Sequence, residues 1–262
     1  MSIHHTAVID SGAELENGVS VGPFSIIGAK VKVGRNTEIG SHVRIEPGVV
    51  VGKNCRVFHN ASLGGEPQIV GFDPKTPSST KIGDGTTIRE YVTVHRSGFE
   101  NGVTQIGKHC LLMAYTHVAH DCKVGNNVII ANNVPLGGHV TIEDNVVIGG
   151  NSAVQQFTRI GQMAMIGGMT GVLHDVIPYG LSVGNRNYLQ GLNLIGLRRA
   201  NFENKDILGL SEAYKEIFAT KNLSENLNKL NGAFKENPLV KNVIEFINKD
   251  KKRSICTPFS KE

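Results

Sequence analysis

The sequence predicts an all-β fold, a parallel β-helix, followed by a C-terminal helical domain. Aliphatic residues recur at every sixth position, and small or β-branched residues stand two positions before them. The composition agrees, because the chain holds 31 Gly and no Trp, and only 6% of its residues are aromatic. A period of six fits neither an α-helix nor a single amphipathic strand, but it fits a short strand and a tight turn repeated many times.

The repeat occupies three stretches of the chain. It runs through residues 9–63, returns over 82–94, and continues through 106–172. Three units make one triangular coil, so each aliphatic side chain is expected to point inward and to stack on its counterpart in the next coil. Gly often follows the aliphatic residue, and we expect it to give the backbone freedom at the corners. The interruptions at 65–81 and 95–103 are predicted to be protruding loops, which often carry function.

This pattern resembles that of the hexapeptide-repeat family over roughly residues 3–184. The resemblance implies the left-handed form of the parallel β-helix, an exception to the usual right-handed crossover that periodicity alone does not reveal. A scaffold without catalytic activity, such as an ice-binding solenoid, is the alternative at this point.

Helical spacing of apolar residues begins after the repeat ends. A helix is predicted over 204–219, a second helix with Ser224 as its N-cap, and a third with Pro238 in its first turn. We therefore expect a β-helix domain at 1–185 and a helical domain at 186–262. The helices carry too few core residues to stand alone, so they should pack on the prism or on a neighbouring subunit.

Charge and cysteine content exclude several classes of protein. The net charge of +4 is too small to indicate nucleic-acid binding, although residues 186–262 hold 14 Lys and Arg against 9 Asp and Glu. Cys55, Cys110, Cys122 and Cys256 form no CxxC pair, so they are expected to be small buried residues of a reducing compartment. The sequence shows no signal peptide and no apolar run long enough to span a membrane, which predicts a cytoplasmic protein.

The segment from Thr116 to Asp121 carries the strongest chemical signal. In the repeat frame His120 and Asp121 fall on a surface turn, and a histidine beside a carboxylate is a candidate general base. Positions 120, 138 and 156 share one column of the prism, so Gly138 is predicted to offer a backbone N–H near His120. A metal site would need a third convergent ligand and is not expected.

A more specific resemblance covers nearly the whole chain. The acyl-carrier-protein-dependent UDP-N-acetylglucosamine O-acyltransferases are similar to this sequence in five segments: IREYVTVHR (88–96), HVAHDC (117–122), GGHV (137–140), AVQQF (153–157) and GNRNYLQGLNLIGLRRANF (184–202). The resemblance implies that a homotrimer transfers a 3-hydroxyacyl chain from acyl carrier protein to position 3 of a UDP-amino-sugar, the first step of lipid A biosynthesis. It implies no metal and no organic cofactor.

The same resemblance assigns roles to individual residues. His120 corresponds to the general base, Asp121 to its partner carboxylate and Gly138 to the donor for the oxyanion. Gly168 corresponds to the floor of the acyl groove, where Gly admits a long chain. The residues that match substrate-binding positions are Gln68, His117, His139, Gln156, Gly168, Asn193, Arg198 and Arg199.

Four positions depart from the family pattern and concern substrate placement. Gln155 replaces a common His, Ile69 follows Gln68 where the family has Asp, Ile195 replaces an acid, and Ala200 replaces a second basic residue. They leave open whether the acceptor is UDP-N-acetylglucosamine or its 3-amino analogue. An acetyl-CoA-dependent relative and the related N-acyltransferase remain alternative readings.

Overall fold

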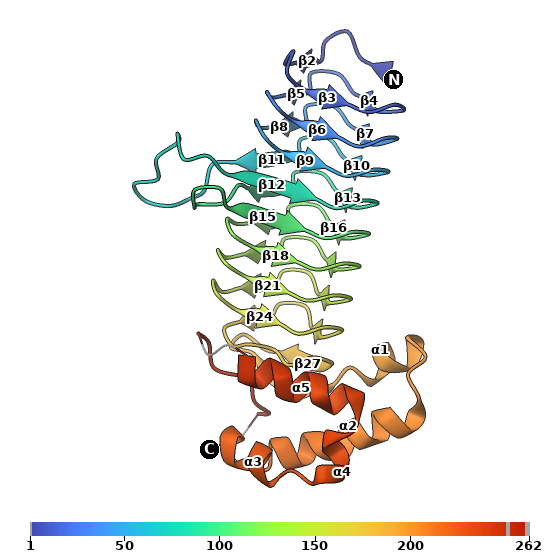
Figure 1. The fold of residues 1–262 in the computed structure, drawn as a ribbon, viewed down its shortest axis with the longest axis vertical. Coiled ribbons are helices and arrows are strands. Elements are labelled where there is room, and N and C mark those ends of the chain that lie inside the picture. The colour runs from blue at the N-terminus through green and yellow to red at the C-terminus, as the bar shows by residue number, and fades with distance from the viewer. Residues whose placement is uncertain (1, 250–251, 260–262) are drawn as a thin grey trace.

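The computed structural model describes residues 2–249 and 252–259. Short parallel strands stack into a prism of triangular cross-section, with the N-terminus at one end and the helices at the other (Figure 1). Its three faces are sheets of 11, 9 and 8 strands, which we call sheets A, B and C. The prism is the parallel β-helix that the repeat predicts.

Each of the first eight coils contributes one strand to every sheet, and all pairings are parallel except that of β27 with β28. Sheet A contains β1 (Ser2–Ile3), β4 (Ser20–Val21), β7 (Glu38–Ile39), β10 (Arg56–Val57), β13 (Thr87–Ile88), β16 (Leu111–Leu112), β19 (Ile129–Ile130), β22 (Val147–Ile148), β25 (Met165–Ile166), β27 (Gly180–Val183) and β28 (Tyr188–Leu192). Sheet B contains β2 (Val8–Ile9), β5 (Ile26–Ile27), β8 (Arg44–Ile45), β11 (Ser62–Gly65), β14 (Thr93–His95), β17 (His117–Val118), β20 (Pro135–Leu136), β23 (Ala153–Val154) and β26 (Gly171–Val172). Sheet C contains β3 (Glu14–Leu15), β6 (Lys32–Val33), β9 (Val50–Val51), β12 (Ser79–Ile82), β15 (Val103–Ile106), β18 (Lys123–Val124), β21 (Thr141–Ile142) and β24 (Arg159–Ile160).

The second residue of most strands points into the prism and forms its core. Val118 pairs with Leu136 in the next coil, and Leu136 pairs with Val154, so the aliphatic side chains form a column. All three are almost completely buried. Burying one such side chain contributes about 1.5–3 kcal/mol, so the repeated column holds the coils in register. The predicted inward stack is confirmed.

The explanation of the repeated glycines is wrong. The second turn residue at most corners has positive φ, and it is usually Asn or another non-glycine residue. Gly22 has no positive φ, and a Cβ added to it would lie 2.7 Å from the carbonyl carbon of Gly40 in the next coil. Glycine is therefore required there because successive coils approach closely.

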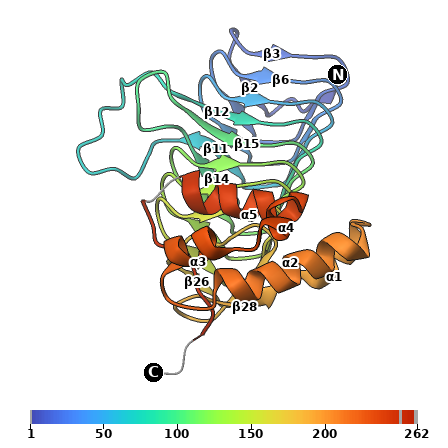
Figure 2. The ribbon, with the colours of Figure 1, turned by 60° about the horizontal axis from the view of Figure 1, so that its bottom comes forward.

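The two interruptions of the repeat protrude from the prism at the corner between sheets B and C (Figure 1). One loop connects β11 to β12, and the other connects β14 to β15. A tail of helices follows β28 and covers the C-terminal end of the prism (Figure 2). These helices are α1 (Leu194–Arg199), α2 (Asn204–Ile217), α3 (Leu223–Lys229), α4 (Gly232–Lys235) and α5 (Pro238–Lys249).

The three predicted helices correspond to α2, α3 and α5, whereas the short helices α1 and α4 were not predicted. The N-cap of α3 is Asn222, whose side chain accepts a hydrogen bond from the Glu225 N–H, so the assignment to Ser224 is wrong. The expected packing on the prism is present. The guanidinium of Arg159 pairs with Asp175 at 2.8 Å and donates to the carbonyl of Phe246 in α5 at 3.0 Å.

The four cysteines are free and buried, as the sequence predicts. Burial raises the pKa of each thiol, to about 12 for Cys122 and Cys256. No helix in the described ranges has the length and apolar character that a bilayer crossing requires.

Candidate active site

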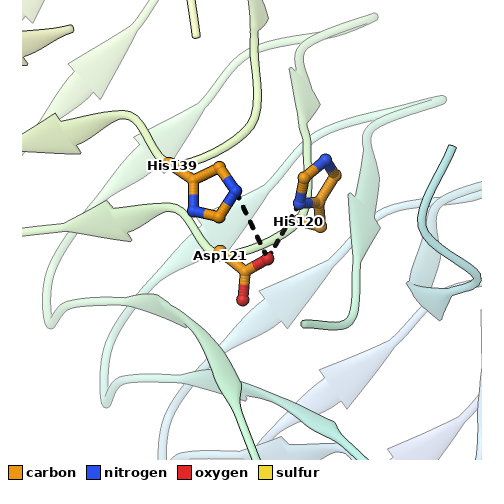
Figure 3. Close-up of side chains that lie close together, drawn as sticks. All are labelled: His120, Asp121 and His139. Carbon is orange, nitrogen blue, oxygen red and sulfur yellow. Dashed lines mark hydrogen bonds and ion pairs between the residues drawn. The ribbon is translucent and has the colours of Figure 1, made fainter. Parts of the chain in front are cut away.

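The corner between sheets B and C places His120 and Asp121 on one turn. Strand β17 ends at Val118, whose side chain is fixed in the core, and the turn follows directly. Asp121 occupies the left-handed region with a φ of 61°, and its N–H donates to the Thr104 hydroxyl at 2.8 Å. The repeat therefore holds both side chains on a rigid edge (Figure 3).

Three donors converge on the Asp121 carboxylate. One oxygen accepts from His120 Nδ1 at 2.8 Å and from the Gly98 N–H at 3.2 Å, and the other accepts from the Ser97 hydroxyl. Burial by itself would raise the pKa of this carboxyl group, but these hydrogen bonds outweigh burial and lower the pKa. Asp121 is therefore an oriented carboxylate at neutral pH.

Because this carboxylate accepts from Nδ1, the neutral His120 ring carries its proton there and has a lone pair on Nε2. Nε2 faces Gly138: a Cβ at position 138 would lie 2.7 Å from it. Within the described ranges, neither His120 Nε2 nor the Gly138 N–H has a hydrogen-bond partner. The imidazole thus occupies the space that a side chain at position 138 would fill, so only glycine lets this proton acceptor lie against this stretch of backbone.

Three more histidines surround this pair. His139 Nε2 lies 3.9 Å from Asp121, its ring meets His120 edge to face, and it stacks on Phe157 with centroids 4.5 Å apart. His117 Nδ1 lies 2.7 Å from the Thr93 hydroxyl. Burial lowers the pKa of both rings, and for His139 nearby Asp121 partly offsets that effect.

His95 is the third histidine, and its ring meets His117 edge to face at 4.7 Å. Burial, together with the neighbouring histidines His117 and His120, lowers the pKa of His95 to about 4. Its ring is therefore neutral at physiological pH, and the surroundings of the base contain no added positive charge from these rings.

A metal ion is a second possible use of this cluster. One donor atom each from His120, Asp121 and His139 lies within 4.8 Å of the others. Both Asp121 oxygens, however, already accept hydrogen bonds, and a metal would have to displace donors that the fold holds in place. The arrangement favours proton transfer over metal chemistry.

The structure brings together six of the predicted site residues along one corner. Backbone hydrogen bonds tie the column: the His139 N–H donates to the His120 carbonyl, and the Phe157 N–H donates to the Gly138 carbonyl. Gln156 follows one coil below Gly138, as the 18-residue spacing predicts. The six residues are His117, His120, Asp121, Gly138, His139 and Gln156.

The other predicted residues lie elsewhere within this single chain. Gly168 sits on the corner between sheets A and B. Asn193 caps α1 by accepting from the Gly196 N–H, and its amide donates to the Met163 carbonyl. Arg198 and Arg199 are exposed in the last turn of α1. Gln68 is exposed in the first protruding loop, one residue before Ile69, which reaches Gly98.

Sequence reasoning assigned no role to His95 and missed four further residues that shape the site. Ser97 and Gly98 come from the second protruding loop, whose path has no periodic signal. Thr104 was visible only as an inward-facing small residue. Phe157 was detectable, because it falls one 18-residue coil after His139.

Comparisons with known proteins show which sequences and structures this chain resembles. Residues 175–256 match the family described as UDP-N-acetylglucosamine O-acyltransferase, domain 2, and residues 12–47 and 104–134 match bacterial transferase hexapeptide repeats. The acyl-[acyl-carrier-protein]–UDP-N-acetylglucosamine O-acyltransferase of Thermodesulfovibrio yellowstonii is 45% identical, covering 97% of this chain and 98% of the relative. The enzyme of that name from Rickettsia canadensis is also 45% identical, covering 97% of each chain. The crystal structure of the Francisella novicida UDP-N-acetylglucosamine acyltransferase superposes with a TM-score of 0.93 at 34% identity, covering 97% of this chain and 94% of that one.

Proposed function

Because this chain belongs to the UDP-N-acetylglucosamine O-acyltransferase family, we propose that the corner holding His120 is its catalytic centre. The chain is an acyltransferase that moves an acyl group from acyl carrier protein to UDP-N-acetylglucosamine, in lipid A biosynthesis. The acyl group in this proposal is a 3-hydroxyacyl chain. The observation that supports the site most strongly is the contact of His120 with Gly138: the imidazole, with its Nε2, fills the space that a side chain at position 138 would occupy.

In this mechanism His120 is the general base. Its Nε2 takes the proton from the 3-hydroxyl of the acceptor as the oxygen attacks the thioester carbonyl carbon. The Gly138 N–H donates to the oxyanion of the tetrahedral intermediate. When the carbon–sulfur bond breaks, the thiolate of the carrier leaves and receives the proton from His120. Asp121 holds the imidazole in position and stabilises its positive charge between these two transfers.

No metal or organic cofactor is required in this proposal, because the thioester already activates the acyl group. One base, one oxyanion donor and accurate placement of both substrates are sufficient for the transfer. His117, His139 and Gln156 are proposed to contact the acceptor sugar, since they lie along the same corner as the base. Gln68 is proposed to reach the acceptor from the first protruding loop.

The remaining substrate contacts are proposed to come from a second copy of the chain in a homotrimer. Gly168, Asn193 and Arg199 lie away from His120 within one chain, so the site is incomplete without a partner. The outward faces of the sheets support this arrangement. The outward residues of sheet A are apolar in the C-terminal coils, whereas those of sheet C are polar or charged: Leu111, Ile129, Val147 and Met165 against Lys81, Gln105, Lys123 and Arg159.

The domains proposed at 1–185 and 186–262 contribute different parts of the site. The β-helix supplies the base, its carboxylate and the oxyanion donor. The helical domain supplies Arg198 and Arg199 and an excess of basic residues, which would attract the acidic carrier protein over a screening length of about 8–10 Å. The reaction is proposed to take place in the cytoplasm.

One assay tests this function against its alternatives. The protein is incubated with 3-hydroxyacyl carrier protein or with acetyl-CoA, together with UDP-N-acetylglucosamine or its 3-amino analogue, and acylated sugar is detected by mass spectrometry. The proposal expects an O-acylated product from the carrier-bound donor. Preference for the 3-amino sugar would show that the acceptor is the 3-amino analogue, and preference for acetyl-CoA would show that the donor is not carrier-bound. Absence of product from every pair would favour a scaffold without catalytic activity.

A further inference from the structure

A basic pocket lies beyond Gln156, at the C-terminal end of the column formed by His120, Gly138 and Gln156. It is a cavity of about 310 Å³ lined by Gln155, Leu173, His174, Arg186, Lys252, Arg253 and Ser254. Three of these residues are basic, and the lining contains no carboxylate. Neither Arg186 nor Arg253 takes part in an ion pair within residues 2–249 and 252–259. Two arginines that share one hollow, with no ion-pair partner in the described residues and no carboxylate in the lining, indicate an anionic ligand.

The wall of this pocket is held in place by the C-terminal segment, which adds to the edge of the last coil. The Asp175 N–H donates to the Ser254 carbonyl at 2.9 Å, and the Cys256 N–H donates to the Asp175 carbonyl at 2.8 Å. The Leu189 N–H donates to the Thr257 carbonyl at 2.8 Å. Cys256 is completely buried. Lys252 and Arg253 therefore precede an anchored segment of the chain, which fixes their position.

Two contacts connect the pocket to the catalytic corner. Arg253 Nε donates to the carbonyl of Gln156 at 3.1 Å, and the Lys252 ammonium lies 5.5 Å from the centroid of the Phe157 ring. Phe157 in turn stacks on His139. Residues 155 and 174 lie two and three coils below His120, which is about 10–14 Å at the usual strand spacing. A sugar ring with its attached diphosphate spans a distance of this order.

We propose that the basic pocket binds phosphate groups of a substrate, with Arg253 and Arg186 as the main ligands. This inference rests on the proposed function, which brings two phosphate-bearing substrates to the corner. The UDP-sugar carries a diphosphate, and the prosthetic arm of the carrier carries a phosphodiester. Arginine suits either group, since its planar guanidinium offers paired N–H donors to phosphate oxygens.

Steady-state kinetics with Arg253→Gln and Arg186→Gln test the proposal. Loss of one charged contact is expected to raise the KM of the phosphate-bearing substrate about tenfold or more and to leave kcat within about threefold. Arg253→Lys should recover part of the loss because it keeps the charge. Lys81→Gln makes the same charge change on the exposed outer face of sheet C and should leave both KM values unchanged.

Calorimetry identifies the source of the phosphate without requiring turnover. UDP, uridine and 4′-phosphopantetheine are each titrated into wild-type protein and into Arg253→Gln. A weakened affinity for UDP, with uridine unaffected, assigns the pocket to the acceptor; a weakened affinity for 4′-phosphopantetheine assigns it to the donor. The proposal is overturned if the Arg186→Gln, Arg253→Gln double variant keeps both affinities and both KM values within twofold of wild type. If wild-type protein binds UDP but transfers no acyl group, the proposed function is contradicted, whereas the proposal that the pocket binds phosphate is not.

Discussion

Replacing Ser97 with Ala tests how Asp121 positions the base. Ser97 is completely buried, and its hydroxyl donates to one Asp121 oxygen while accepting from the Phe99 N–H at 3.1 Å. A hydrogen bond to a charged group contributes about 1.5–3 kcal/mol. We expect the variant to lose about this much stability at neutral pH. We also expect kcat to fall about tenfold with little change in KM, since the carboxylate that orients His120 would be held by two donors instead of three.

The pH dependence of this stability loss separates it from a general packing defect. The folded-state pKa of Asp121 lies below its ordinary value, so the stabilisation is fully present above the unfolded-state pKa of about 3.9 and disappears as the pH falls through the folded-state pKa. Urea unfolding of wild type and Ser97→Ala from pH 7 down to pH 3 measures whether the difference between their free energies of unfolding becomes smaller.

A matched control is Ser25→Ala. Ser25 is equally buried, and its hydroxyl donates to the Gly40 carbonyl and accepts from the Val43 N–H, with no carboxylate involved. Its stability loss should be independent of pH, and its kcat should equal that of wild type. Ser97 does not hold Asp121 in the proposed way if Ser97→Ala keeps wild-type kcat, or if its stability loss is the same at pH 3 as at pH 7.

Three further predictions concern the substrates and the oxyanion. Gly138→Ala should lower kcat at least a hundredfold, because the new Cβ would lie 2.6 Å from His120 Cε1. Gly12 lies on the same corner near the N-terminus, and Gly12→Ala should retain full activity in the same assay. Gly168→Met should shift donor preference toward shorter acyl chains, roughly tenfold for two carbons at about 0.8 kcal/mol each, and an unchanged chain-length profile would exclude Gly168 as the groove floor. The KM for acyl carrier protein should rise steeply between low salt and 0.5 M salt. A KM that does not change with salt concentration would argue against electrostatic attraction of the carrier.

The six-residue period predicted the fold in detail because each repeat places one aliphatic side chain in the core. Val118, Leu136 and Val154 were identified from spacing alone, and the structure stacks them in adjacent coils. The same spacing predicts that His120, Gly138 and Gln156 share one edge of the prism. A strictly periodic scaffold turns sequence separation directly into spatial separation.

The period did not predict features that depend on contacts between neighbouring coils or on segments outside the repeat. The glycine at position 22 is required by the backbone of the neighbouring coil rather than by its own φ, which the sequence does not distinguish. Asn222 and Ser224 are both good N-caps, and only the path of the chain before α3 selects Asn222. Ser97 could not be found, since its contact with Asp121 depends on how an irregular loop folds back onto the corner.

The turnover of His120→Ala shows directly whether His120 is the general base. The measurement is kcat for acyl transfer from 3-hydroxyacyl carrier protein to UDP-N-acetylglucosamine, followed by mass spectrometry, with the thermal unfolding midpoint and the oligomeric state recorded for the same samples. Loss of a general base costs about 10²–10⁴-fold. We expect a loss in this range in a variant that folds and assembles like wild type. A variant that keeps more than about a tenth of the wild-type kcat would contradict it.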